Sequence, residues 1–263
     1  MTRKVEYLKN TNKYLEIRFK KHQENWDSVI AIVGDTGTGK SNLGLHFLHK
    51  WCELKNGKVE ASDVSSMCLT KEDFLINLAT VEKKAMIVYD EAGDLSSRRA
   101  MSDFNVRLML AYKVIRLHGL FTVLIIDDIF DLDTSFRNKK IKGLFKVTKR
   151  GEVKFWGRDK VRLLMALNQN RLIKSYELVS PDFTDKYPVY SGVMAKEYEK
   201  MKERKVEEYR KALAGEVKNP LDPTFIKISL LDELGYNIQE IAYELGMSFE
   251  AVRKYIYVKH KED

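Results

Sequence analysis

Cysteine is nearly absent from this chain, which has only Cys52 and Cys68 among its 263 residues. They form neither a disulfide framework nor a metal-ligand spacing, so we expect reduced core thiols. Long hydrophobic runs are also missing, since the longest, from Gly119 to Ile126, is far too short to cross a bilayer. The N-terminus has no apolar signal-peptide core. We therefore expect a soluble, cytoplasmic protein without a membrane span.

Proline is scarce and unevenly placed. All four prolines lie at residue 181 or later, so the first two-thirds of the chain is expected to form one compact domain. The stretch from Gly215 to Pro223 holds two prolines and a glycine, and it is the best domain boundary. We predict a first domain at 1–192, a charged helix and linker at 193–223, and a second domain at 224–263. Alternating charges on the helix are typical of a solvated connector.

Apolar strands and helices alternate along the first domain. Buried strands are predicted at 28–33, 85–90 and 120–126, and helices at 40–54 and 103–118. A further helix is expected after Thr70, which can cap it. Continuous apolar strands alternating with helices predict an α/β fold with a mainly parallel sheet covered on both faces. After Arg137 the pattern changes to a hairpin at 143–157.

The loop after the first strand fits the phosphate-binding pattern G-x-x-x-x-G-K-[ST] in full. It follows a buried strand and opens a helix, which is the context this P-loop motif needs. Its glycines allow backbone N–H groups to point inward, and the helix N-terminus adds partial positive charge. The pattern predicts ATP and Mg²⁺ as cofactors. The expected nucleotide contacts are Gly34, Asp35, Thr36, Gly37, Thr38, Gly39, Lys40, Ser41 and Asn42.

Two acidic residues end the second apolar strand. Asp90 stands where a Walker B aspartate would bind Mg²⁺ through water, while Ser41 would ligate the ion. Glu91 could orient and deprotonate the attacking water. Lys40 would face the β- and γ-phosphates. An arginine is also expected to neutralise transferring charge: Arg137 is the first candidate, ahead of Arg98, Arg99 and Arg116. Hydrolysis of ATP to ADP and phosphate is the predicted reaction.

The segments Ile87–Gly93 and Ser96–Arg99, with Leu132, Asp133 and Arg137, resemble a group of archaeal and viral ATPases. These belong to the division of P-loop enzymes that includes the HerA and FtsK DNA motors, conjugative coupling proteins and phage Zot-like assembly ATPases. The resemblance covers roughly residues 28–140. It implies a RecA-like core, a homo-oligomeric and possibly ring-forming habit, and a DNA substrate. One departure is acidic Asp127-Asp128 after the third strand, where a neutral polar residue is expected.

The chain's net charge of +8 is concentrated between Arg137 and Arg162, which hold eleven Lys or Arg against Glu152 and Asp159. A hairpin with that charge suits contacts with a DNA backbone. Its expected DNA contacts are Lys146, Lys149, Arg150 and Lys154. The alternative is a basic hairpin that is merely solvated.

The C-terminal segment from Gly235 to Ile256 resembles a helix-turn-helix of the sigma-factor and resolvase kind, which predicts a small all-α domain. Gly246 can take the positive φ of the turn and Ser248 can cap the second helix. That helix would present Phe249, Arg253 and Lys254 to the major groove of duplex DNA. The alternative is a helical tail for protein interaction.

Together these patterns predict an ATP-hydrolysing DNA-binding protein, a motor or remodeller in DNA replication, transfer or packaging. The alternative is an ATP-switched initiator or regulator, similar to DnaA or to transposition helpers, with slow turnover. A small-molecule kinase is disfavoured by Glu91 and by the C-terminal segment.

Overall fold

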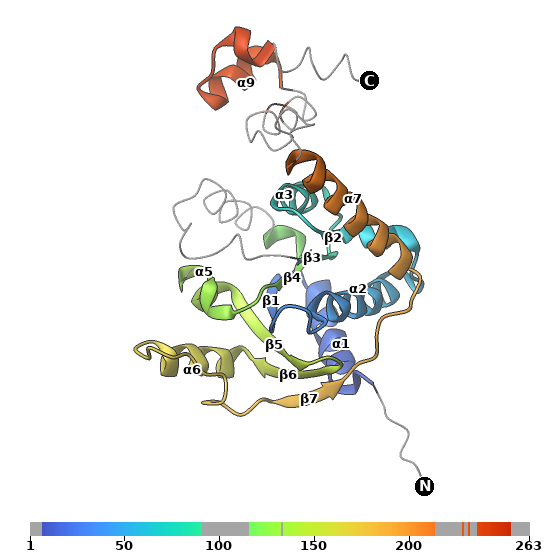
Figure 1. The fold of residues 1–263 in the computed structure, drawn as a ribbon, viewed down its shortest axis with the longest axis vertical. Helices are drawn as coiled ribbons and strands as arrows, with labels where there is room; N and C mark the ends of the chain where they lie inside the picture. The colour runs from blue at the N-terminus through green and yellow to red at the C-terminus, as the bar shows by residue number, and fades with distance from the viewer. Residues whose placement is uncertain are drawn as a thin grey trace. The chain divides into compact units, whose positions relative to one another are not determined.

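The computed structural model describes residues 7–90, 116–132, 134–213, 228, 231 and 236–253. The chain divides into two compact units, residues 1–202 and 203–263. The first unit is an α/β structure built on one seven-stranded sheet (Figure 1). The predicted α/β class with a mainly parallel sheet is therefore confirmed.

The strands agree closely with the expected ones where the sequence predicted them. They are β1 (Ser28–Val33), β2 (Met67–Cys68), β3 (Met86–Asp90), β4 (Phe121–Ile125), β5 (Ile141–Lys149), β6 (Glu152–Gly157) and β7 (Phe183–Lys186). The α-helices are α1 (Lys9–Gln23), α2 (Lys40–Asn56), α3 (Lys71–Thr80), α5 (Thr134–Lys140), α6 (Arg158–Asn168), α7 (Ala195–Leu213) and α9 (Ile238–Leu245). Short 3₁₀ helices are η1 (Ala61–Ser66), η4 (Arg116–His118) and η5 (Ile129–Asp131).

The strand order is β2-β3-β4-β1-β5-β6-β7. Strands β2, β3, β4, β1 and β5 run parallel, and β6 and β7 extend the sheet in antiparallel fashion. Strand β4 thus lies between β1, which leads into the P-loop, and β3, which ends at Asp90. This mostly parallel arrangement is consistent with the RecA-like core that the resemblance implies. It also places the carboxyl ends of β1 and β3 at the same edge of the sheet.

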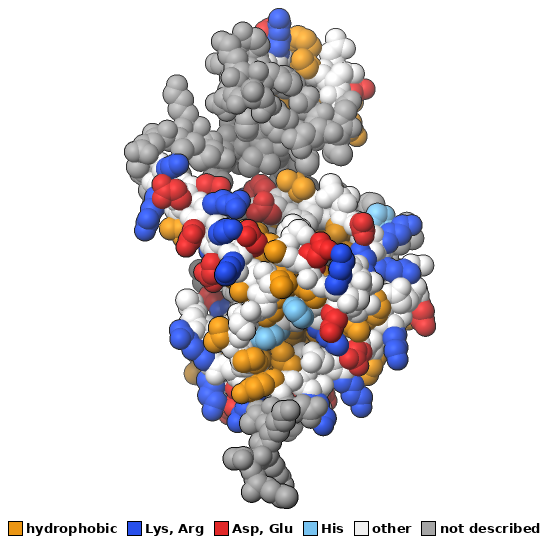
Figure 2. Space-filling view, turned by 90° about the vertical axis from the view of Figure 1, so that its right-hand side faces the viewer, with side chains coloured by type: hydrophobic (Ala, Val, Ile, Leu, Met, Phe, Trp, Pro, Cys, Tyr) orange, Lys and Arg blue, Asp and Glu red, His pale blue; other side chains and the backbone are white. Residues whose placement is uncertain are grey.

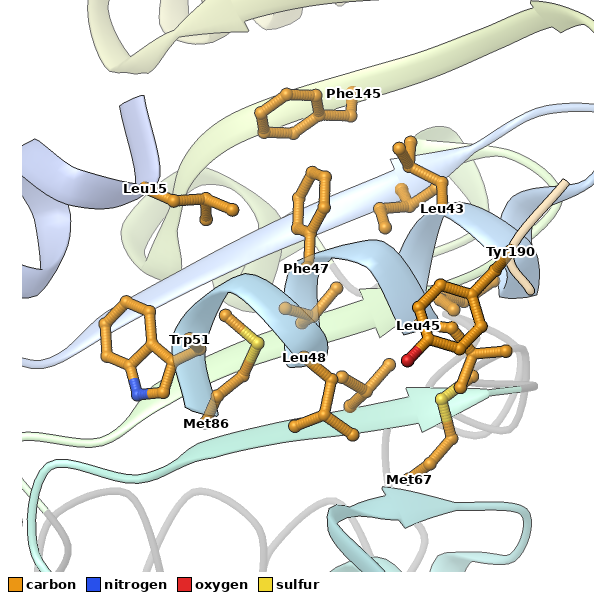
Figure 3. Close-up of a cluster of buried hydrophobic side chains, with 14 of the residues drawn as sticks. Leu15, Leu43, Leu45, Phe47, Leu48, Trp51, Met67, Met86, Phe145 and Tyr190 are labelled. Atoms are coloured by element: carbon orange, nitrogen blue, oxygen red, sulfur yellow. The ribbon is translucent and has the colours of Figure 1, made fainter. Parts of the chain in front are cut away.

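Both faces of the sheet are buried, which explains why the central strands are apolar without alternation. Helices α1 and α2 cover one face, where Phe47 and Trp51 of α2 pack among Leu15, Met86 and Phe145 (Figure 3). On the other face Phe74 and Leu78 of α3 and Val161 and Leu164 of α6 pack against the strands. Every residue of β1 is buried because it serves both cores at once.

The expected hairpin at 143–157 exists, with its turn at Arg150-Gly151, but it is part of the central sheet rather than an arm. Strand β5 pairs with the P-loop strand β1, and β6 pairs with β7. The aromatic residues Phe145, Phe155 and Trp156 are buried in the two cores. They are therefore structural and are not exposed for stacking on bases.

Helix α1 and strand β7 were not predicted, because their sequences lack a clear apolar period. The buried carboxylate of Asp185 in β7 joins them. It accepts hydrogen bonds from the Thr11 backbone N–H at 2.7 Å, the Thr11 hydroxyl at 2.8 Å and the Asn10 side chain at 2.9 Å. A negative charge at the first turn of α1 also suits the helix dipole. Asp185 thus fixes the N-terminal helix to the sheet edge.

In the second unit, α9 begins with an Asn237–Glu240 capping box and ends at Gly246, whose φ is 61°. Ser248 then accepts a hydrogen bond from the Ala251 N–H at 3.2 Å, and the chain is helical from 249 to 253. Ile228, Ile241, Ala242 and Val252 form a small buried core. The turn and cap thus have the local geometry that the sequence predicted. Most of the expected helix at 225–234 lies outside the described residues.

Within the part of the chain that the structure describes, no helix is both long enough and apolar enough to cross a membrane.

Replacing Asp185 with Ala should lower the free energy of unfolding by about 2–3 kcal/mol, because the buried Thr11 N–H and hydroxyl lose a charged acceptor. The neighbouring exposed residue Thr184 offers a matched control, and Thr184→Ala should change stability by less than about 0.5 kcal/mol. Urea unfolding followed by circular dichroism measures both. Equal midpoints for the two variants would show that Asp185 does not fix α1.

Candidate functional site: the P-loop cleft

The loop between β1 and α2 is held in a conformation that requires glycine. Gly34, Gly37 and Gly39 have φ values of 148°, 78° and 99°. A Cβ at Gly34 would lie 2.6 Å from the backbone oxygen of Val147 in β5. The loop therefore packs directly against the neighbouring strand, which constrains its curvature.

Lys40, the first residue of α2, folds back over this loop. Its ammonium group donates to the Gly34 oxygen at 2.7 Å, the Asp35 oxygen at 3.1 Å and the Asp127 carboxylate at 2.8 Å. An ammonium group has three donors, so the P-loop oxygens and Asp127 together use all three. Because Asp127 is largely exposed, its ion pair with Lys40 is readily exchanged for another anion.

Ser41, the residue after Lys40, contacts Asp90 at the end of β3. The Ser41 hydroxyl donates to Oδ1 of Asp90 at 3.0 Å, and the phenol of Tyr198 in α7 donates to Oδ2. Asp90 itself is buried. Burial and the neighbouring Asp90 carboxylate raise the pKa of Tyr198 well above its usual range, so the phenol remains a proton donor. The site thus contains one hydroxyl, one carboxylate and one phenol in contact.

These groups line a cleft of about 890 Å³ at the carboxyl ends of the parallel strands. One wall is the P-loop from Thr36 to Asn42, with Asp90 and Asp127 beside it. The opposite wall comes from far along the chain. It consists of Arg150, Gly151, Tyr187, Pro188, Val189, Tyr190, Ala195, Tyr198, Glu199 and Lys202.

Polar side chains of α2 hold that second wall through hydrogen bonds. The Asn42 side chain donates to the Pro188 oxygen at 3.0 Å and accepts from the Tyr190 N–H. His46 lies 3.0 Å from the same Pro188 oxygen, and His49 lies 2.9 Å from the Tyr190 hydroxyl. The side chain of Asn42, expected to contact the nucleotide, is therefore engaged in fixing the wall.

On the face that includes α7, acidic and basic side chains are interspersed with hydrophobic and histidine side chains (Figure 2).

The four hairpin cations predicted to contact DNA do not form one free patch. Arg150 donates from Nε to the Gly37 oxygen at 3.0 Å and lines the P-loop cleft. The ammonium of Lys146 lies 4.0 Å from the centre of the Tyr176 ring, and Lys149 is ion-paired with Glu152. Lys154 is half-buried opposite Lys146.

The candidate arginines and the acidic pair after β4 also have defined places. Arg137 donates to the Phe130 oxygen at 3.0 Å and lines a separate hollow of about 310 Å³, not the P-loop cleft. Arg116 precedes β4 and so lies at the other end of the sheet.

Asp128 accepts from the Tyr176 hydroxyl and the Phe130 N–H, which makes it structural, whereas Asp127 faces Lys40.

Several predicted residues lie outside the described residues. They are Glu91, Arg98, Arg99, Asp133, Lys254 and nearly all of the helix expected at 103–118. Phe249 and Arg253 are described, and both are exposed in the second unit.

Sequence reasoning missed Tyr198 and the wall at 187–190. The charged helix was expected to be a solvated connector, but Met194 and Tyr198 are buried and Met201 packs on the same core. Their i, i+4, i+7 spacing is an apolar stripe in a charged helix. That stripe was the available signal that the first turns of the helix pack against the core beside the P-loop cleft.

No protein-family model matches the sequence, and no curated protein matches it either. Among solved structures, the chain is similar to the crystal structure of the N-terminal domain of zonular occludens toxin from Neisseria meningitidis. The identity is 14%, the match covers 64% of this chain and 97% of that chain, and the TM-score is 0.37. The function proposed below therefore rests on the P-loop cleft.

Gly34→Ala should lower the free energy of unfolding by about 2–4 kcal/mol, since the new Cβ meets a backbone oxygen. Gly37→Ala is the control: its φ is also positive, but nothing lies within 4 Å of the added Cβ. It should cost only about 1 kcal/mol of backbone strain. Chemical denaturation measures both, and equal losses would mean that β5 does not constrain the loop.

Proposed function

We propose that this chain is a P-loop ATPase that binds DNA. One observation carries the proposal: Lys40, Ser41 and Asp90 lie together in a single cleft, around a glycine loop at the N-terminus of α2. A helix N-terminus with free N–H groups and a nearby ammonium favours a polyphosphate. The cleft volume also suits a nucleotide, since small-molecule sites are typically several hundred Å³.

In this proposal the loop N–H groups and Lys40 bind the β- and γ-phosphates. The Lys40 ammonium exchanges the exposed Asp127 carboxylate for a phosphate oxygen, which requires only a small movement. Arg150, which is anchored to Gly37, stands beside the loop as a second cation. Its position supports a contact with the phosphates from within the same chain.

The residues present also fit Mg²⁺. The cation prefers hard oxygen ligands, takes one or two from protein, and fills its remaining sites with water and phosphate. Ser41 and Asp90 supply such oxygens. No group of three or more His, Cys, Asp or Glu side chains suited to a metal is found among the described residues. The proposal therefore does not have protein side chains supplying all of the ligands. When bound, Mg²⁺ would neutralise charge on the phosphates.

Hydrolysis in this proposal depends on Glu91, the residue directly after Asp90. A carboxylate at this point can accept a proton from water and orient it for in-line attack. The products would be ADP and phosphate. Arg137 would act only on a neighbouring copy, because it does not line its own cleft.

Two features support DNA as the partner. The chain is basic, and the second unit contains two helical segments joined by a tight turn with Arg253 exposed. We infer that this unit is a helix-turn-helix domain that reads duplex DNA. The finer role proposed is a homo-oligomeric motor or remodeller.

One observation favours a second function, the ATP-switched regulator. The hairpin that a motor would use to grip DNA is part of the sheet, and Arg150 serves the P-loop. DNA contact then depends mainly on the second unit, as in a regulator. DNA-stimulated ATPase activity with strand movement supports the motor, whereas slow turnover with sequence-specific binding supports the switch.

Lys40→Ala and Glu91→Gln should separate binding from turnover. Loss of the ammonium group should weaken binding of a fluorescent ATP analogue at least about tenfold, the size of a lost charged hydrogen bond. Glu91→Gln should retain binding while hydrolysis falls by about 10²-fold or more. Exposed Lys58→Ala is the control and should leave both unchanged. Normal ATP binding by Lys40→Ala would refute the P-loop assignment.

DNA binding should be divided between two elements. Removing residues 224–263 should erase sequence preference, worth about 1–3 kcal/mol per good base contact. Lys149→Ala with Lys154→Ala should weaken all duplexes alike and lower the log–log salt slope by about 0.9 per lost phosphate contact. Lys200→Ala removes a similar charge elsewhere as a control. A truncated chain that binds every duplex like the full chain would identify the tail as a protein-interaction segment.

A further inference from the structure

A tyrosine occupies the position between the two expected cation ligands. The Tyr198 phenol donates to Oδ2 of Asp90 and is also within hydrogen-bonding reach of Ser41. Only 2% of Tyr198 is exposed. The phenol oxygen therefore occupies space beside Ser41 and Asp90, the two groups that would hold a cation.

Tyr198 is one member of a face of α7 that closes this end of the cleft. Ala195, Tyr198, Glu199 and Lys202 all line it, at the i, i+3, i+4, i+7 spacing of one helical face. The Lys202 ammonium lies 4.5 Å from the centre of the Tyr198 ring. Met194, directly before the helix, is fully buried. The phenol is therefore positioned by a packed helix, and it cannot leave Asp90 without movement of that helix or of its core neighbours.

We propose that Tyr198 gates the divalent-cation site: the site is closed while the phenol is bonded to Asp90, and the phenol must be released before Mg²⁺ and nucleotide bind together. This inference rests on the proposed ATPase function and adds its regulation. Closing and opening would be linked to the position of the first two turns of α7, which then report the state of the cleft.

The Tyr198 phenol and a hydrated Mg²⁺ ion are expected to compete for Asp90, because both need the same acceptor and the same space. The phenol donates a hydrogen bond to Asp90, and a water molecule on Mg²⁺ would donate to the same carboxylate. Mg²⁺ requires near-ideal octahedral geometry and keeps several waters. A buried ring that contacts both Ser41 and Asp90 takes the volume these waters need. If Tyr198 instead remained bonded, it would orient Asp90 and favour the cation, so the two models predict opposite effects of removing the hydroxyl.

The experiment compares Tyr198→Phe with Tyr209→Phe, which makes the same change at an exposed site on the same helix. Binding of a fluorescent ATP analogue is titrated with Mg²⁺, and melting is followed in EDTA. For Tyr198→Phe we expect the half-saturating Mg²⁺ concentration to fall about tenfold, since a closing hydrogen bond to a charged group is lost. Its melting temperature in EDTA should fall as well. Tyr209→Phe should match the wild type in both measurements.

Hydrogen exchange on the wild-type protein provides a test that needs no variant. Amides of residues 195–202 should exchange faster with Mg²⁺ and a non-hydrolysable ATP analogue than in EDTA. An unchanged or higher Mg²⁺ requirement in Tyr198→Phe, or equal exchange in both states, would overturn the gate. Failure of the wild type to bind the analogue at any Mg²⁺ concentration would instead overturn the proposed ATPase function.

Discussion

Helix α2 packs so closely on the sheet at Gly44 that any side chain there would force its neighbours to shift, and the cleft depends on this approach. A Cβ there would lie 2.9 Å from Cδ1 of Ile125 in β4 and 3.3 Å from Cγ1 of Val88 in β3. The close packing brings the helix N-terminus over the ends of β1, β3 and β4. Lys40 can then reach Asp127, and Ser41 can reach Asp90, although these partners are far apart in the chain. A wider spacing would separate the helix dipole from the carboxylate that completes the site.

The elements predicted correctly are those whose signal is local. The strand 28–33, the P-loop, the Thr70 cap and the turn at Arg150-Gly151 each follow from a few consecutive residues. Helix α1 and strand β7 could not be predicted in the same way, because their stability comes from Asp185 and from packing between distant segments. The same holds for the site. The P-loop residues and Asp90 were predictable as a motif, whereas Tyr198 and the wall at 187–190 join the cleft only through tertiary contacts.

The basic hairpin shows that local charge does not determine where each side chain points. The eleven Lys and Arg between residues 137 and 162 led to the prediction of a DNA-binding hairpin. Alternation along a strand, however, sends neighbouring side chains to opposite faces, and a turn sends its residues to the sheet edge. Lys146 consequently faces Tyr176, whereas Arg150 at the turn reaches Gly37. Local charge density gave no information on this, because the positions depend on pairing of β5 with β1. A count of cations therefore predicts the sign of a surface's charge better than it predicts what each cation contacts.

Lys40 and Asp90, which would face the phosphates and the cation, already have internal partners: Asp127 for the first, Ser41 and Tyr198 for the second. Binding of a phosphate and a cation in the proposed function is thus an exchange of partners, in which old hydrogen bonds offset much of the gain from new ones. The two exchanges differ in difficulty. Asp127 is largely exposed, so its carboxylate can turn toward water, whereas Tyr198 is buried and attached to a packed helix. The cation side of the cleft is therefore the side at which binding must be coupled to a change in the protein.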